Sequence, residues 1–182
     1  MHIVSGSTQE LPEGKPNELA NYRYRVFVEQ LGWELPANDK LELDQFDRSD
    51  TVYVIGEKDG RLIGCARLLP TTRPYLLSDV FPDLLNGMEP PASPDIWELS
   101  RFAAIDFDER NTAPSGQFSS DVAIELLRES LACAKSKGAK RVICVSTIGV
   151  ERLMRRAGFD CHRVGPPKIV DGYPLIACWI TP

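Results

Sequence analysis

No run of apolar residues in this 182-residue sequence approaches the roughly 20 that a membrane-spanning helix requires. Residues 1–5 also lack the basic and apolar regions with which a secretory signal peptide begins. Both absences favour a cytoplasmic protein, and we expect no membrane partner.

Motifs for metals and nucleotides are missing as well. The two histidines and five cysteines include no C-x-x-C pair and no spacing typical of a zinc site. We therefore expect no metal, and we expect the cysteines to be small buried thiols in a reducing compartment. Neither G-x-G-x-x-G nor a P-loop occurs, which argues against a doubly wound nucleotide-binding fold.

Acidic residues outnumber basic ones, but the two signs are not evenly spread. The net charge is −5, yet residues 135–168 contain nine Lys or Arg against two Asp or Glu. A basic segment on an acidic protein fits an acidic protein partner and disfavours non-specific nucleic-acid binding. The alternative is an ordinary solvated helix face, and composition alone favours that interpretation.

The length and the 43% hydrophobic content fit one globular domain over residues 1–182. Apolar periodicity predicts an order of helix, hairpin, strand, helix, strand, helix and strand. This order predicts a three-layer α/β/α domain with a mixed, mainly antiparallel twisted sheet, in which the last two strand–helix units allow a parallel pairing. The predicted helices are 17–31, 118–136 and 148–157, the strands 51–57, 61–69, 96–104, 142–146 and 175–180, and the long loops 33–50 and 106–117.

Charged residues occupy several positions where this pattern expects apolar ones. Arg23 lies on the apolar side of the first helix, Arg67 and Glu98 lie in apolar strands, and Asp44 and Asp47 flank an aromatic residue in the first long loop. An isolated buried charge costs several kcal/mol, so we expect these groups to pair with one another or with a charged ligand. The pattern alone leaves two interpretations open, an architectural ion-pair network and a functional site.

Four blocks in order resemble the acyl-homoserine lactone synthases. They are residues 23–33 (RYRVFVEQLGW), 44–47 (DQFD), 64–72 (GCARLLPTT) and 97–103 (WELSRFA), and the similarity runs from about residue 19 to the end of the chain. Residues 149–159 (GVERLMRRAGF) also resemble a segment of the GCN5-type N-acetyltransferases. The resemblance implies a fold related to those enzymes.

The resemblance also implies a two-step reaction on S-adenosylmethionine, which is a substrate, so that no cofactor is expected. The amine attacks the acyl thioester on acyl carrier protein, and the carboxylate then closes the lactone and expels methylthioadenosine. By resemblance the site consists of nine residues: Arg23, Phe27, Trp33, Asp44, Asp47, Arg67, Glu98, Ser100 and Arg101.

Within this set the resemblance implies distinct roles. Glu98 is the candidate base, acting directly or through a water, with Ser100 and Arg101 beside it in the catalytic set. Asp44 and Asp47 suit a cationic substrate, and Phe27 and Trp33 are expected to contact the sulfonium or adenine, with core packing as the alternative. Arg67 and Arg101 are expected to hold the carboxylates and the loop in place. In a regular strand Arg101 faces away from Glu98 and Ser100, and a bulge or a splayed strand there would reconcile the three residues.

The acyl donor is expected to meet the basic segment, because acyl carrier protein is acidic. The candidate docking residues are Lys137, Lys140, Arg141, Arg152, Arg155 and Arg156, and acyl-CoA remains a possible donor. Cys144 and Ser146 are expected in the acyl pocket. Family members that prefer 3-oxo chains often have Thr where this sequence has Cys144, so an unsubstituted chain is expected. By analogy with similar family members, its length is expected to be about six to ten carbons. Two other classes stay open, an N-acyltransferase that uses acyl-CoA on another amine and a non-catalytic ligand sensor.

Overall fold

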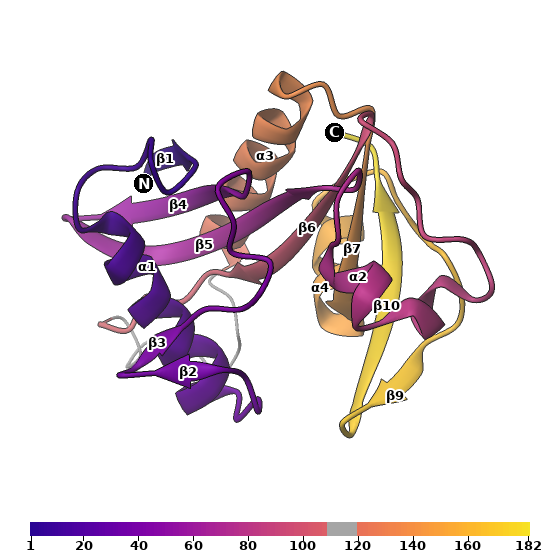
Figure 1. Ribbon diagram of the computed structural model, residues 1–182, viewed down its shortest axis with the longest axis horizontal. Helices are drawn as coiled ribbons and strands as arrows, with labels where there is room; N and C mark the ends of the chain where they lie inside the picture. The colour runs from indigo at the N-terminus through magenta and orange to yellow at the C-terminus, as the bar shows by residue number, and fades with distance from the viewer. Residues whose placement is uncertain (109–119) are drawn as a thin grey trace. The chain divides into compact units, whose positions relative to one another are not determined.

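A computed structural model describes residues 1–108 and 120–182 (Figure 1). The chain forms two compact units, Met1–Arg67 with Arg101–Glu129 and Leu68–Ser100 with Ser130–Pro182. Strands β5 (Arg61–Pro70) and β6 (Ile96–Ala103) and helix α3 (Ser120–Ser136) each contribute residues to both units. The expectation of a single domain over residues 1–182 stays a prediction. Most of the polar loop expected at 106–117 lies outside the described residues.

The first unit combines a helical N-terminal segment with part of the sheet. Strand β1, which the sequence pattern missed, pairs antiparallel with β4, with Ile3 opposite Gly56. The predicted hairpin between β4 and β5 is confirmed, because Asp59 and Gly60 both have positive φ (52° and 77°), as a type I′ turn requires. The elements are β1 (His2–Gly6), α1 (Lys15–Arg23), a π-helix η1 (Tyr24–Gln30), β2 (Ala37–Asn38), β3 (Leu41–Glu42), β4 (Val52–Lys58) and β5 (Arg61–Pro70).

The helix predicted at 17–31 is present but changes its winding after Arg23. From Tyr24 to Gln30 the backbone is a π-helix, and the Leu31 N–H donates to the carbonyl of Val26 five residues back. A pattern with a period of 3.6 residues does not distinguish the two helix types. Gly32, at φ 69°, follows the π-helix where the sequence placed the helix end. Pi-helical segments are rare and often lie at functional sites.

The second unit is built around β10, which pairs antiparallel with β7, β8 and β9. On the other side of β7 lies β6, and these two strands are parallel from Ile96 opposite Arg141 to Leu99 opposite Cys144. Helix α4 follows β7 directly and has contacts with β7, β8 and β10. The elements are α2 (Leu76–Asp79), a 3₁₀-helix η2 (Pro82–Leu85), β6 (Ile96–Ala103), α3 (Ser120–Ser136), β7 (Arg141–Thr147), α4 (Ile148–Arg156), β8 (Cys161–Arg163), β9 (Lys168–Val170) and β10 (Tyr173–Ile180).

The predicted class, a mixed and mainly antiparallel sheet with helices, is therefore confirmed, as is the parallel pairing of two late strands. The pattern missed β8 and β9, which have only three residues each. The prediction of buried thiols is confirmed for four of the five cysteines: all five are free thiols, and all except Cys133 are buried. In the part of the chain that the structure describes, no helix combines the length and the apolar character needed to cross a bilayer.

Candidate functional site

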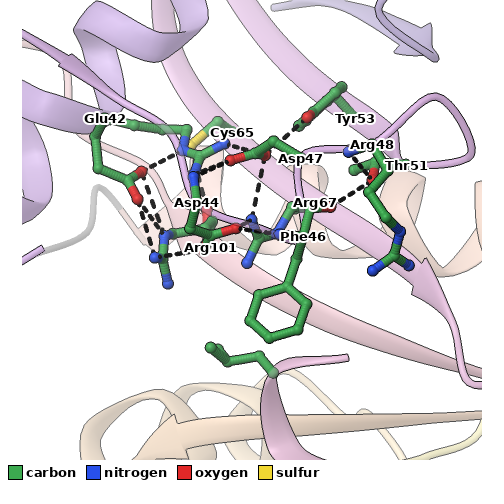
Figure 2. Close-up of polar contacts among 12 residues, drawn as sticks. Glu42, Asp44, Phe46, Asp47, Arg48, Thr51, Tyr53, Cys65, Arg67 and Arg101 are labelled. Carbon is green, nitrogen blue, oxygen red and sulfur yellow. Dashed lines mark hydrogen bonds and ion pairs between the residues drawn. The ribbon is translucent and has the colours of Figure 1, made fainter. Parts of the chain in front are cut away.

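Three arginines and three carboxylates in the first unit form one buried network, here called the ionic cluster (Figure 2). Arg23 comes from the end of α1, Arg67 from β5 and Arg101 from β6, while the carboxylates come from β3 and the loop after it. Arg23, Arg67 and Glu42 are no more than 1% exposed. The members of the cluster are Arg23, Glu42, Asp44, Asp47, Arg67 and Arg101.

Asp47 is the most heavily bonded carboxylate of the cluster. Arg23 binds it with both terminal nitrogens, at 2.7 and 3.0 Å, and Arg67 Nη1 adds a contact at 3.2 Å. The Tyr53 hydroxyl and the Asp44 N–H also donate to it, each at 2.8 Å. Burial alone would raise the pKa of this carboxyl, but the hydrogen bonds and charge of Arg23 and the charge of Arg67 outweigh burial and lower the pKa below its ordinary value.

Asp44 and Glu42 join the remaining arginines. Asp44 accepts from Arg67 Nη1 at 2.6 Å and from Arg101 Nη2 at 2.8 Å. Glu42 accepts from Arg23 Nε at 2.5 Å and from Arg101 Nη2 at 2.9 Å. Three positive and three negative charges thus balance, which offsets the large desolvation cost of burying them.

Glu42 was not among the predicted site residues. The pattern of charges predicted that Asp44, Asp47 and Glu98 pair with buried arginines or a charged ligand, whereas Glu42 is the third carboxylate of the ionic cluster. A signal was present, because Glu42 and Asp44 alternate with Leu41 and Leu43 just before the DQFD block. The very short strand β3 carries this alternation, and the long-loop interpretation concealed it.

Arg101 has a backbone conformation that explains how it joins the cluster. Its φ is 51°, in the left-handed region, although it lies within β6. This torsion departs from that of a regular strand, and Glu98, Ser100 and Arg101 are all buried, while the bulge itself stays a prediction. Arg101 uses Nε and Nη2 in the cluster; among residues 1–108 and 120–182, Nη1 has no acceptor.

Phe27 and Trp33 form a stacked pair, with ring centroids 5.1 Å apart and an interplanar angle of 24°. The backbone N–H of Trp33 donates to the backbone carbonyl of Phe27 at 2.9 Å, so the end of the π-helix holds the two residues together. Phe27 is buried, and Arg101 lies 5.7 Å from the centre of its ring. Trp33 is only partly buried, so it is the member of the pair with surface available to a ligand.

Glu98 and Ser100 lie on β6 in the second unit, and both are buried. The carboxylate of Glu98 accepts from the backbone N–H groups of Leu77, at 2.6 Å, and Leu76, at 3.0 Å. These N–H groups open the short helix α2, so Glu98 fixes the start of that helix. The role of Glu98 as base stays a prediction.

Cys144 and Ser146 lie on one face of β7 and are buried, opposite Cys178 and Ile176 of β10. Burial raises the pKa of the Cys144 thiol well above its ordinary value, so the group is neutral. The Ser146 hydroxyl donates to the Thr147 carbonyl at 3.2 Å. Their place in an acyl pocket stays a prediction.

The six candidate docking residues differ in how they are engaged. Lys140 pairs with Asp95 at 2.7 Å, and Arg141 lies 3.7 Å from the centre of the Trp179 ring. Arg155 pairs at 3.0 Å with Glu151, a buried residue that also binds Arg163 at 2.5 Å. All six are exposed, and three of them have neither an acidic partner nor a ring contact in the described part of the chain: Lys137, Arg152 and Arg156.

A profile of the family described as autoinducer synthase matches residues 7–180 of the sequence. The chain belongs to the autoinducer synthase family. Among its relatives is an acyl-homoserine-lactone synthase of Acinetobacter nosocomialis, 52% identical over 99% of both chains. The activity is therefore that of an acyl-homoserine-lactone synthase, which is an acyltransferase.

Solved structures agree with this assignment. The structure of TofI in a ternary complex with an inhibitor and MTA has a TM-score of 0.86 and 46% identity, covering 100% of this chain and 91% of that one. A CoA-dependent synthase, BjaI, with SAM and isopentyl-CoA, has a TM-score of 0.85 and 28% identity, covering 98% and 82%. An acyl-CoA N-acyltransferase from Pseudomonas aeruginosa, at 16% identity, 98% and 99% coverage and a TM-score of 0.67, shares the fold alone.

Proposed function

We propose that this synthase acylates S-adenosylmethionine from an acyl group on acyl carrier protein and then closes the lactone. In the first step the amine nitrogen bonds to the thioester carbonyl carbon, the C–S bond breaks, and the carrier thiol leaves. The amine proton passes to a base. In the second step a carboxylate oxygen bonds to the γ-carbon, the C–S⁺ bond breaks, and methylthioadenosine leaves.

The observation that carries the assignment of the amino-acid substrate is the Nη1 donor of Arg101, which has no acceptor within residues 1–108 and 120–182. The ionic cluster is already charge-balanced, so it does not need a ligand for neutrality. Nη1 is therefore assigned to a substrate carboxylate, and lactone closure depends mainly on orienting that carboxylate. The complexes of TofI with MTA and of BjaI with SAM support a substrate of this chemistry.

The cationic part of the substrate is assigned to Asp44 and Trp33. Asp47 already accepts five hydrogen bonds, so its proposed role is to hold Arg23 and Arg67 in place. Asp44 makes fewer contacts, and its negative charge suits a sulfonium or an ammonium group. The available surface of Trp33 suits stacking or a cation–π contact. Phe27, behind Trp33, supports that ring and Arg101.

Glu98 is the proposed acceptor of the amine proton, directly or through a water. The backbone N–H groups of Leu76 and Leu77 donate to this carboxylate and hold it in a fixed orientation, which is what a general base needs. Ser100 stays in the proposed catalytic set as its neighbour on β6.

The proposed donor is acyl carrier protein, bound through the basic surface of the second unit. Because Lys140 and Arg155 already have acidic partners, Lys137, Arg152 and Arg156 are the proposed principal contacts. Arg152 and Arg156 are four residues apart on α4 and therefore share one face. Acyl-CoA is the alternative donor.

The proposed acyl chain is unsubstituted and of medium length, about six to ten carbons. Cys144, with Ser146 on the same face of β7, is assigned to the acyl pocket. A thiol is a poor hydrogen-bond donor for a 3-oxo group, whereas a hydroxyl is a good one.

The test combines purified protein and S-adenosylmethionine with matched donors. Each acyl chain is supplied on acyl carrier protein and on CoA, with and without a 3-oxo group. We expect methylthioadenosine and an acyl-homoserine lactone in equal amounts, with a higher kcat/KM for the carrier-bound, unsubstituted chains. A higher kcat/KM for acyl-CoA would overturn the donor assignment, and a predominant 3-oxo product would overturn the chain assignment.

A further inference from the structure

Cys65 is a buried thiol next to the ionic cluster. It contacts Arg101, the member of the cluster that has a left-handed backbone torsion. It belongs to β5, is 1% exposed, and its thiol donates to the carbonyl oxygen of Arg101 with Sγ 3.2 Å from O (Figure 2). Around it pack apolar residues of the first unit, among them Tyr22, Phe27 and Ala103. From the sequence alone, Cys65 is predicted only to be a small buried thiol.

The carbonyl that Cys65 binds belongs to a residue held in an unfavourable conformation. A left-handed φ is unfavourable for a residue with a Cβ, and such a conformation persists only where surrounding contacts impose it. At Arg101 this conformation sends the guanidinium to Glu42 and Asp44. In an extended conformation the side chain would leave the strand on a different side, and these bonds would be lost.

We propose that Cys65 is a positioning residue that holds the Arg101 backbone in its left-handed conformation and so aims Nη1 of Arg101 at the substrate carboxylate. This inference rests on the proposed role of Arg101 in binding S-adenosylmethionine. The proposal adds Cys65, a residue of β5, to the residues that position the substrate, without assigning its side chain a contact with the substrate.

The chemistry of the site suits a hydrogen-bond donor and not a nucleophile. Burial raises the pKa of the Cys65 thiol to about 12. The group therefore keeps its proton throughout the neutral range and donates it to the carbonyl. Serine preserves such a donor, whereas alanine removes it, which makes the pair of substitutions informative.

The experiment compares Cys65→Ala and Cys65→Ser with the parent enzyme. Cys178→Ala is the matched control, because Cys178 is also a fully buried thiol but lies in the second unit. We expect Cys65→Ala to raise KM for S-adenosylmethionine about threefold to tenfold, in line with the loss of up to about 1.4 kcal/mol of binding. KM for the acyl donor is expected to stay unchanged. Cys65→Ser should restore KM to within about twofold, and Cys178→Ala should leave KM for S-adenosylmethionine unchanged.

A double-mutant cycle with Arg101→Gln separates this inference from the proposed function. If Cys65 acts through Arg101, Cys65→Ala has no further effect on KM once Arg101 is Gln. Effects that multiply, or a Cys65→Ser variant as impaired as Cys65→Ala, would overturn the role of Cys65. If instead Arg101→Gln leaves KM for S-adenosylmethionine unchanged, the proposed function of Arg101 fails, whatever the Cys65 variants do.

Discussion

Glu42 and Arg101 come together from positions 59 residues apart, with Oε1 2.9 Å from Nη2. Their side chains are 0% and 5% exposed. Arg23 binds the other oxygen of the same carboxylate, so Glu42 links the first helix to strand β6. Neutralising Glu42 leaves the buried side chains of Arg23 and Arg101 with one carboxylate fewer to bind.

We therefore expect Glu42→Gln to lower the free energy of unfolding by about 3 kcal/mol, since breaking a buried ion pair from one side strands the other charge. Urea denaturation at neutral pH measures this change. Glu29→Gln is the control, because Glu29 is exposed on the π-helix, and it is expected to change stability by less than about 0.5 kcal/mol. Equal stabilities of the two variants would contradict the central place of Glu42.

The lowered pKa of Asp47 leads to a prediction of how the free energy of unfolding depends on pH. Its pKa is lower in the folded than in the unfolded protein, because Arg23 and Arg67 outweigh the effect of burial. The stabilisation is therefore fully present above the unfolded pKa of about 4 and is lost as the pH falls toward the folded pKa. The difference in unfolding free energy between the parent and Asp47→Asn should be constant from pH 7 to 5 and shrink below pH 4. A difference independent of pH down to the acid limit would be inconsistent with a depressed pKa.

Glu98→Gln separates catalysis from architecture. Loss of a general base is expected to lower kcat about 100-fold or more, while S-adenosylmethionine still binds. The carboxamide NH₂ also faces the N–H of Leu76 or Leu77, so some stability is lost as well. Calorimetric titration with S-adenosylmethionine and a thermal melt identify that structural part. Turnover at the parental rate would remove Glu98 as the base.

The basic surface of the second unit predicts which substitutions raise KM for the carrier-bound donor most. Arg152→Gln with Arg156→Gln should raise KM for acyl-acyl carrier protein and weaken its dependence on salt, because fewer charges attract the acidic partner. Lys140→Gln should have a smaller effect, because Lys140 already pairs with Asp95. The measurement is a series of KM values at increasing salt. Identical salt dependence in the parent and the double variant would exclude this surface.

Cys144 tests the prediction for the acyl chain. Cys144→Thr supplies a hydroxyl and is expected to raise kcat/KM for 3-oxo donors relative to unsubstituted ones, by up to about tenfold. Valine has nearly the same shape as threonine but no hydroxyl, so Cys144→Val controls for packing in this buried position. The same change in preference in both variants would mean that volume, and not hydrogen bonding, is responsible.

Short-range patterns account for what could be predicted about the fold. Asp59-Gly60 specified a turn because its backbone tolerates positive φ, and the apolar periods of β7 and α4 identified a strand followed by a helix. The two- and three-residue strands escaped prediction because they contain too few residues to show a period. The π-helix escaped it because the same side-chain order fits both windings.

By itself the sequence determined the family, through four ordered blocks, and the presence of charges that had to be paired in the interior. Only the tertiary structure decided which charges meet: Glu42 instead of Glu98 completes the ionic cluster, and Cys65 reaches the carbonyl of Arg101. The physical reason is that pairing depends on distance in space and on single backbone torsions. The left-handed φ of Arg101 is one such torsion, and no residue type near it in the sequence predicts that value.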